Sequence, residues 1–246
     1  MSMEISSAGV GSAAPNVSLA SLLTAYPANP GELLPAPSVI PRRLLHRVDS
    51  GANFSRNVRR TLHERFQNVF MQMTPRIKAK DIDLYTHSQR VLTSTLHLLH
   101  ALDLSREEVI AIALAAYFHD IGKLFIEDAL IKKPTALTAD EYGIIQQHPA
   151  FSVDLLSPYI ASQVSALSFV YHHHERWDGR GYPCGLAGED IPLGARIIAI
   201  VDAFDAMTSE RVYQARRTPY EAMEELIRCA GTQFDPCLVR LFLIVR

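Results

Sequence analysis

The sequence predicts an all-α protein, and two observations support this class. After residue 53, apolar residues recur at helical spacing through most of the chain, in segments that mostly open at Ser, Thr, Asp or Pro. No segment combines the strict alternation of a half-buried strand with a hairpin signal. With 246 residues, of which 48% are hydrophobic, the chain can bury one substantial core. We therefore expect one main helical domain.

The N-terminal part of the chain has a different composition. Residues 1–52 are rich in Ser, Ala, Pro and Gly, which bury little surface and, at proline, lack a backbone donor. We expect a disordered tail, in which "LASLLTAY" at 19–26 could form a helical turn that docks on a partner. Residues 53–75 are expected to form a connector helix, because the apolar residues of Phe54–Phe70 have helical spacing and Ser55 is a candidate N-cap.

Further helical segments fill the expected main domain, residues 76–246. They span residues 83–102, 105–122, 137–148, 157–174, 192–209, 218–231 and 235–244. At the start of the second segment, Ser105 and Glu108 form a capping box. No repeat of fixed period connects the segments, so a solenoid is not expected.

Charge and cysteine content exclude several classes of protein. The net charge is −2, so no global basic field draws the chain onto a DNA or RNA duplex or an anionic lipid surface. The three cysteines, Cys184, Cys229 and Cys237, form no CxxC pair and are expected to be free thiols in a reducing compartment. The N-terminus lacks the layout of a secretory signal, and no apolar run reaches the ~18 residues of a membrane span. A cytoplasmic protein without a membrane span is expected.

The pair His119 and Asp120 is the first candidate for chemistry. It stands at the end of a strongly apolar helical segment. Burying an imidazole beside a carboxylate is costly unless something compensates, and a metal ion makes the same pair favourable. A hydrogen-bonded pair in the core is the common alternative for a lone HD dipeptide.

Other segments supply matching residues. His87, His148, the run His172–His174 and Asp202 lie at or near the apolar faces of four further expected helices. Three of them have a simpler interpretation: His87 as an exposed residue, His148 as a partner of a helix dipole, and Asp202 as a partner of Arg196. Together, the order H…HD…H…HH…D favours a shared metal centre.

This order resembles the HD-GYP domain, a subgroup of the HD metal-dependent phosphohydrolases. The resemblance runs from about residue 83 to 241 and rests on "HSQRV", "FHDIGKLFI", "KPTALTADEY", "HHERWDGRGYPCGLAGEDIP", "ARIIAIVDAFDAMTSERVY" and "FDP". It implies an HD-type helical bundle with a dinuclear metal centre in its core. It also implies a cyclic di-GMP phosphodiesterase, acting from a domain over residues 76–246.

The resemblance also implies a set of metal ligands. They are His87, His119, Asp120, His148, His173, His174 and Asp202, whereas His172 lies outside the pattern. Asp120 would bridge two divalent ions, and Asp83, four residues before His87, marks the position of an acidic ligand for a third ion. A site rich in nitrogen and oxygen suits Fe or Mn first, with Ni, Co and Zn as alternatives.

Substrate contacts are expected next to these ligands. The resemblance implies that Lys123 and Arg211 contact the substrate phosphate, because a cation there counters the charge that builds on its oxygens. It also implies that Lys123 is catalytic together with Asp120. The attacking group would be a hydroxide generated by the metals, so no side-chain nucleophile is needed.

The "DGRGYP" loop offers an aromatic contact as well. Tyr182 is expected to stack on guanine, with Trp177 as an alternative and simple packing of the loop as another. Glu175 is interpreted as a partner of a ligand histidine or of Arg176.

Three positions depart from the family pattern, and Gln214, together with the long N-terminal tail, leaves the function open to an alternative. Gln214 replaces a basic residue, Ser152 a glycine and Phe118 a leucine, and none is a ligand position. Hydrolysis of cyclic di-GMP to linear pGpG, or further to GMP, is the first hypothesis. A module that binds cyclic di-GMP without cutting it is the alternative, and another nucleotide phosphate is a third. A diguanylate cyclase or other signalling partner and a homodimer are also expected.

Overall fold

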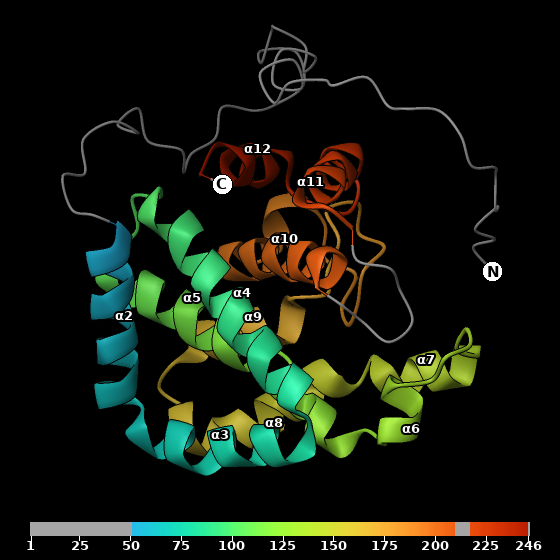
Figure 1. The fold of residues 1–246 in the computed structure, drawn as a ribbon, viewed down its shortest axis with the longest axis horizontal. Coiled ribbons are helices and arrows are strands. Elements are labelled where there is room, and N and C mark those ends of the chain that lie inside the picture. The colour runs from blue at the N-terminus through green and yellow to red at the C-terminus, as the bar shows by residue number, and fades with distance from the viewer. Residues whose placement is uncertain (1–50, 210–216, 246) are drawn as a thin grey trace, which may run out of the picture. The chain divides into compact units, whose positions relative to one another are not determined.

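A computed structural model describes residues 51–209 and 217–245, and this part of the chain is helical (Figure 1). The all-α prediction is confirmed: within these residues there is no strand, only isolated bridges from Asp178 to Ala187 and from Ala230 to Phe234. The expected tail lies outside the described residues, except that Gly51 and Ala52 already belong to a helix. None of the described helices is both long and apolar enough to cross a membrane.

The first two helices differ from the single connector helix that we expected. Helix α2 spans Gly51–Arg65 and α3 spans Gln67–Lys80, with a break at Phe66. Ser55 is therefore inside α2 and is not its N-cap. Pro75 lies inside α3 on its exposed face, where water can reach the carbonyl that loses its partner.

Both helices pack into the main core. Leu62, Val69, Met73 and Ile77 are buried in the same hydrophobic cluster as the helices that follow. The expected domain boundary after residue 75 thus falls inside α3, between two side chains of that cluster.

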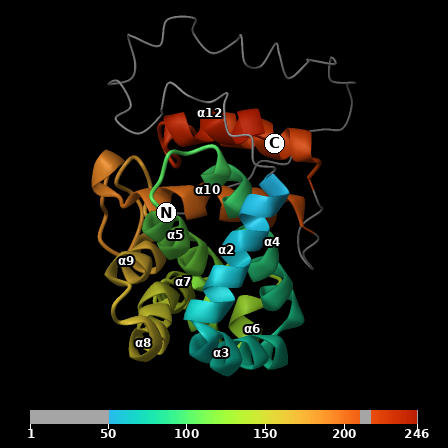
Figure 2. The ribbon, with the colours of Figure 1, turned by 90° about the vertical axis from the view of Figure 1, so that its left-hand side faces the viewer.

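Four helices form the centre of this cluster. They are α4 (Ile82–His100), α5 (Arg106–Phe118), α9 (Val164–His172) and α10 (Leu193–Thr208). From Val109 to Phe118 every residue of α5 is buried, as its apolar sequence requires. The predicted capping box of Ser105 and Glu108 begins this helix. Figures 1 and 2 show α4 and α10 packed around α5.

The remaining elements lie around these four helices (Figure 1). They are η1 (Ile121–Phe125), α6 (Asp128–Ile131), α7 (Ala139–Ile145), α8 (His148–Ile160), η2 (Gly188–Asp190), α11 (Pro219–Arg228) and α12 (Pro236–Val245). Helices α11 and α12 lie together beside α10, α3 and α8 lie at the opposite end, and α6 and α7 project to one side (Figure 1).

A close approach of η1 to α8 joins two parts of the predicted site. A Cβ atom at Gly122 would lie 2.1 Å from the carbonyl oxygen of His148 and 2.6 Å from the nitrogen of Ser152, so only glycine fits. The hydroxyl of Ser152 accepts from the Gly122 N–H over 2.8 Å and donates to the carbonyl of His119 over 2.9 Å. These contacts hold Asp120 next to the start of α8.

Candidate metal centre

The seven predicted ligand residues meet in one place, although they come from five separate parts of the chain. His87 lies in α4, His119 and Asp120 follow α5, His148 begins α8, His173 and His174 follow α9, and Asp202 lies in α10. The donor atoms of six of them form two overlapping groups that share Asp120. One group adds His148, His173 and His174, and the other adds His87 and His119.

Helix ends set the orientation of three imidazoles. The Nδ1 atoms of His119, His148 and His173 donate to the carbonyl oxygens three residues earlier, over 3.0, 2.7 and 2.6 Å. These carbonyls lie in the last turns of α5, α7 and α9, where they have no partner within the helix. Because a carbonyl only accepts, each Nδ1 carries the proton and each Nε2 presents a lone pair.

Two of these lone pairs face each other in the first group. Nε2 of His148 lies 3.3 Å from Nε2 of His173 and 3.2 Å from Oδ1 of Asp120. Oδ1 is buried and has no hydrogen bond. Three acceptors at such distances repel one another unless a cation lies between them, so this arrangement fits a divalent ion.

The second group repeats the arrangement on the other oxygen of Asp120. Nε2 of His87 lies 3.3 Å from Nε2 of His119, and Oδ2 of Asp120 lies 3.6 and 3.5 Å from these atoms. Oδ1 of Asp202 is 3.2 Å from Nε2 of His87. One carboxylate therefore faces two ligand groups, which is the geometry of a bridging ligand.

His174 completes the first group from the side of residues 178–183, the "DGRGYP" segment, which we call the GYP loop. Its ring stacks on Tyr182, with centroids 4.8 Å apart and planes 21° apart. Burial, followed by the charge of His148, lowers the pKa of His174 to about 3. The imidazole is therefore neutral at pH 7, and a neutral imidazole is the form that binds a metal.

The family model described as "HD domain" matches residues 72–238. The chain belongs to the HD domain family. The family binds divalent metal ions, and the two acceptor groups around Asp120 suit them. The predicted resemblance to HD-GYP proteins is confirmed by the relatives that follow.

Curated relatives of this HD domain are phosphodiesterases. The 3'3'-cGAMP-specific phosphodiesterase 2 of Vibrio cholerae is 34% identical over 84% of this chain and 40% of the relative. The cyclic di-GMP phosphodiesterase response regulator RpfG of Xanthomonas campestris is 47% identical over 55% of this chain and 36% of the relative. The chain thus spans less than half of these relatives.

The solved structure of Bd1817, an HDG"Y"P protein from Bdellovibrio bacteriovorus, shares the fold with a TM-score of 0.56. The two sequences are 15% identical, and the structural alignment covers 81% of this chain and 64% of the Bdellovibrio chain.

Two functional residues of the HD domain were missed at the sequence level. Oδ2 of Asp205 accepts from Nδ1 of His87 over 2.8 Å, and Arg90 donates to both oxygens of Asp205 over 2.7 and 2.9 Å. Burial raises the pKa of Asp205, but the bonds from His87 and Arg90 outweigh it and hold the pKa at about 2. The available signal was spacing: Asp205 follows Asp202 by three residues, and Arg90 follows His87 by three.

Glu175 and Asp202 have partners other than those considered. The carboxylate of Glu175 accepts from the backbone N–H groups of Cys184 and Leu186 over 2.7 and 3.1 Å, so it fixes the GYP loop and holds neither a histidine nor Arg176. Arg196 pairs with Asp235 over 2.7 Å, which removes it as the partner of Asp202.

The predicted residues outside the seven have different positions. Nζ of Lys123 lies 2.5 Å from Oδ2 of Asp120. Tyr182 packs on His174. Asp83 is exposed in the first turn of α4 and belongs to neither donor group. Arg211 and Gln214 lie outside the described residues.

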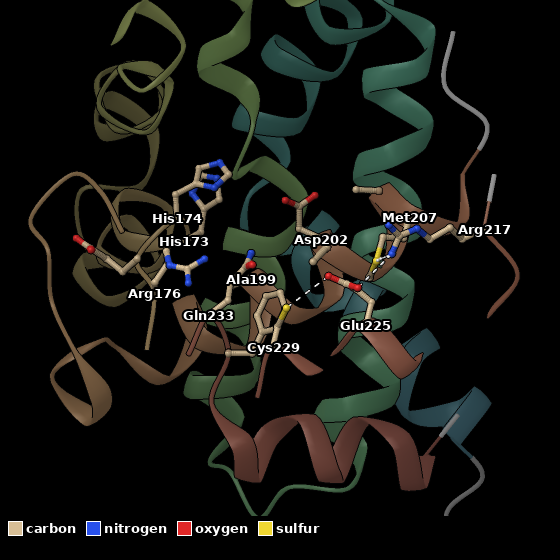
Figure 3. Close-up of a pocket in the computed structure, with 14 residues that line it drawn as sticks. His173, His174, Arg176, Ala199, Asp202, Met207, Arg217, Glu225, Cys229 and Gln233 are labelled. Atoms are coloured by element: carbon tan, nitrogen blue, oxygen red, sulfur yellow. Dashed lines mark hydrogen bonds and ion pairs between the residues drawn. The ribbon is translucent and has the colours of Figure 1, made fainter. Parts of the chain in front are cut away.

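A cavity of about 370 Å³ opens beside the donor groups (Figure 3). His173 and His174 line one end, Arg217 and Glu225 line the other, and Asp202 lies between them. Charged groups of both signs thus line a space that adjoins the candidate metal centre, and such a cavity is a candidate ligand site.

Proposed function

We propose that this HD domain hydrolyses cyclic di-GMP to linear pGpG, or further to GMP, with two divalent metal ions. The observation that carries the proposal is the carboxylate of Asp120 between two pairs of facing Nε2 atoms. Curated relatives named as cyclic di-GMP or 3'3'-cGAMP phosphodiesterases support the substrate class.

The residues that would hold the two ions divide between the groups. His148, His173, His174 and Oδ1 of Asp120 would hold one, and His87, His119, Asp202 and Oδ2 of Asp120 would hold the other. Bound there, the ions supply Lewis acidity toward a phosphodiester and lower the pKa of water toward 7. The imidazole and carboxylate donors suit Fe or Mn, with Ni, Co and Zn as alternatives.

The chain's own residues supply orientation and charge. Backbone carbonyls bind the Nδ1 atoms of His119, His148 and His173, and Asp205 binds that of His87, so Nε2 of each imidazole faces the donor groups. Lys123 lies with its ammonium beside Asp120, and its side chain is 26% exposed, so it can reach a phosphate oxygen at the edge of the centre. We retain Arg211 as a second phosphate contact. A homodimer, a signalling partner such as a diguanylate cyclase, and a third ion at Asp83 remain predictions.

The test compares metal content and turnover in one preparation. The protein is loaded anaerobically with Fe or Mn, and linear products of cyclic di-GMP, 3'3'-cGAMP and cyclic di-AMP are separated by chromatography. We expect about two ions per chain and turnover of cyclic di-GMP, with both lost in Asp120→Asn. The matched control is Asp154→Asn, an exposed aspartate of α8, which should retain both.

Each other outcome identifies an alternative. A loaded protein that cuts none of the three nucleotides overturns the enzymatic proposal. If it then binds cyclic di-GMP, the binding module is the better hypothesis. If 3'3'-cGAMP is cut faster than cyclic di-GMP, the substrate is the one named for the Vibrio relative, whose alignment covers 84% of this chain.

A further inference from the structure

A second cluster of donor atoms lies outside the metal centre described above. His172, Glu175 and Cys184 place one nitrogen, one oxygen and one sulfur atom within 4.8 Å of one another. His172 ends α9, and the other two residues begin and close the segment that carries Tyr182. Neither the HD-GYP pattern nor the proposed reaction uses His172 or Cys184.

The imidazole of His172 is held in the same way as those of the metal centre. Its Nδ1 lies 2.9 Å from the carbonyl oxygen of Ser168 and donates to it. The proton is thereby fixed on Nδ1, and Nε2 keeps a lone pair for a ligand. The ring is half-buried, so its orientation is constrained by packing as well.

The carboxylate of Glu175 is buried and fixed. It is 4% exposed, and its two oxygens accept from the N–H groups of Cys184 and Leu186. An ionised carboxylate offers about four lone-pair directions, so two remain after these bonds. The thiol of Cys184 lies within 4.8 Å of an oxygen of this carboxylate.

Cys184 provides a soft sulfur ligand that solvent can reach. It is a free, exposed cysteine, so an ion can reach the cluster from solvent. On binding, the thiol would lose its proton to water and become the thiolate ligand. No oxidant or reductant is involved in this step.

We propose that His172, Glu175 and Cys184 bind a borderline divalent ion, zinc in preference to manganese or magnesium. A nitrogen, an oxygen and a sulfur ligand are the donor types that zinc combines, and thiolate disfavours the harder ions. With bonds of about 2.0–2.3 Å, tetrahedral ligands lie roughly 3.3–3.7 Å apart, and the three donor atoms, all within 4.8 Å of one another, approach this spacing. Water completes the coordination.

The bound ion would tie the end of α9 to the loop that carries Tyr182. Because Tyr182 stacks on His174, the site would restrain a residue of the first donor group without entering it. The proposal does not depend on the proposed phosphodiesterase activity, since its test measures coordination by sulfur.

Cobalt(II) titration provides that test, because a thiolate ligand adds a near-ultraviolet charge-transfer band and the donor groups around Asp120 contain no sulfur. We expect the band in the full chain, and competition for it by zinc. It should be lost in Cys184→Ser and in His172→Ala, and should persist in the control Cys229→Ser. Circular dichroism establishes that each variant is folded.

A second measurement addresses adventitious binding to a thiol. Zinc at low micromolar concentration should slow alkylation of Cys184, identified by peptide mass spectrometry, at least tenfold in the wild type. It should give no protection in His172→Ala. A wild type without the band, or a band and protection that survive His172→Ala, overturns the proposed site.

Discussion

His87 donates from Nδ1 to Oδ2 of Asp205 over 2.8 Å, across 118 residues of chain. The same carboxylate accepts two bonds from Arg90, so its position is fixed from two sides. The hydrogen bond places the proton of His87 on Nδ1 and turns Nε2 toward His119 and Asp120. Asp205 is therefore a positioning residue for the second donor group.

Asp205→Asn should weaken metal binding without unfolding the domain. An amide has no negative charge to pair with Arg90, and its NH2 group can face Nδ1 and reverse the imidazole tautomer. Loss of such an outer partner lowers metal affinity about 10- to 100-fold. Competition of the loaded protein with a chelator of known affinity measures the change. Asp103→Asn, an exposed aspartate, is the control, and equal affinities in the two variants would exclude the positioning role.

The order of His and Asp residues along the chain favoured a shared metal centre, and the resemblance to HD-GYP domains then selected the residues that meet. Each stands at the apolar face or at the end of a helix, so burial brings them together once the helices pack. The helical class was predictable for the same reason. The break at Phe66 was not, because the apolar spacing continues through it while the backbone changes direction.

The partners of the predicted residues could not be predicted in the same way. Asp202 and Asp205 are both aspartates on one helix, and only the packing of α10 against α4 shows that the second holds the Nδ1 of His87. Glu175 bonds to backbone N–H groups, which any residue at positions 184 and 186 other than proline would supply. A pattern of side chains carries no signal for such bonds.

Ser152→Ala should destabilise the domain by about 2–4 kcal/mol, because it leaves the buried N–H of Gly122 and the carbonyl of His119 unpaired. Ser152, which stands where the family commonly has glycine, thus bonds to the backbone of His119, a predicted ligand. The sequence did not indicate this contact. Urea unfolding of metal-free protein measures the change. Ser157→Ala on the same helix removes only a bond to the carbonyl of Val153, and should cost less than about 1 kcal/mol.

Metal-free protein should lose stability as the pH falls below about 6.5. Burial lowers the pKa values of His119, His173 and His174, the last to about 3, so the unfolded chain binds protons that the folded chain does not. His174, with its pKa at about 3, should by itself cost about 1 kcal/mol between pH 7 and 5.5, and His119 and His173 act in the same direction.

His87 acts in the opposite sense, because its bonds to Asp202 and Asp205 outweigh burial and raise its pKa to about 9. Its contribution is complete below about pH 6.5 and is lost as the pH rises toward 9. Urea unfolding in the presence of a chelator, at pH 5.5, 7 and 8.5, measures both slopes. His63→Gln, an exposed histidine, should leave them unchanged. Constant stability between pH 7 and 5.5 would contradict the assignment of neutral buried imidazoles.

Tyr182 offers a test between packing and substrate contact. Its ring stacks on His174 and lies 6.3 Å from the ring of Tyr142, so the aromatic face orients a residue of the first donor group. An aromatic pair contributes about 0.5–1.5 kcal/mol, so Tyr182→Leu should weaken metal binding by about 2- to 12-fold. Tyr182→Phe keeps the ring and should match the wild type in both metal affinity and KM. If Tyr182→Phe instead raises KM while metal affinity stays constant, the hydroxyl contacts the substrate, and the ring does more than position His174.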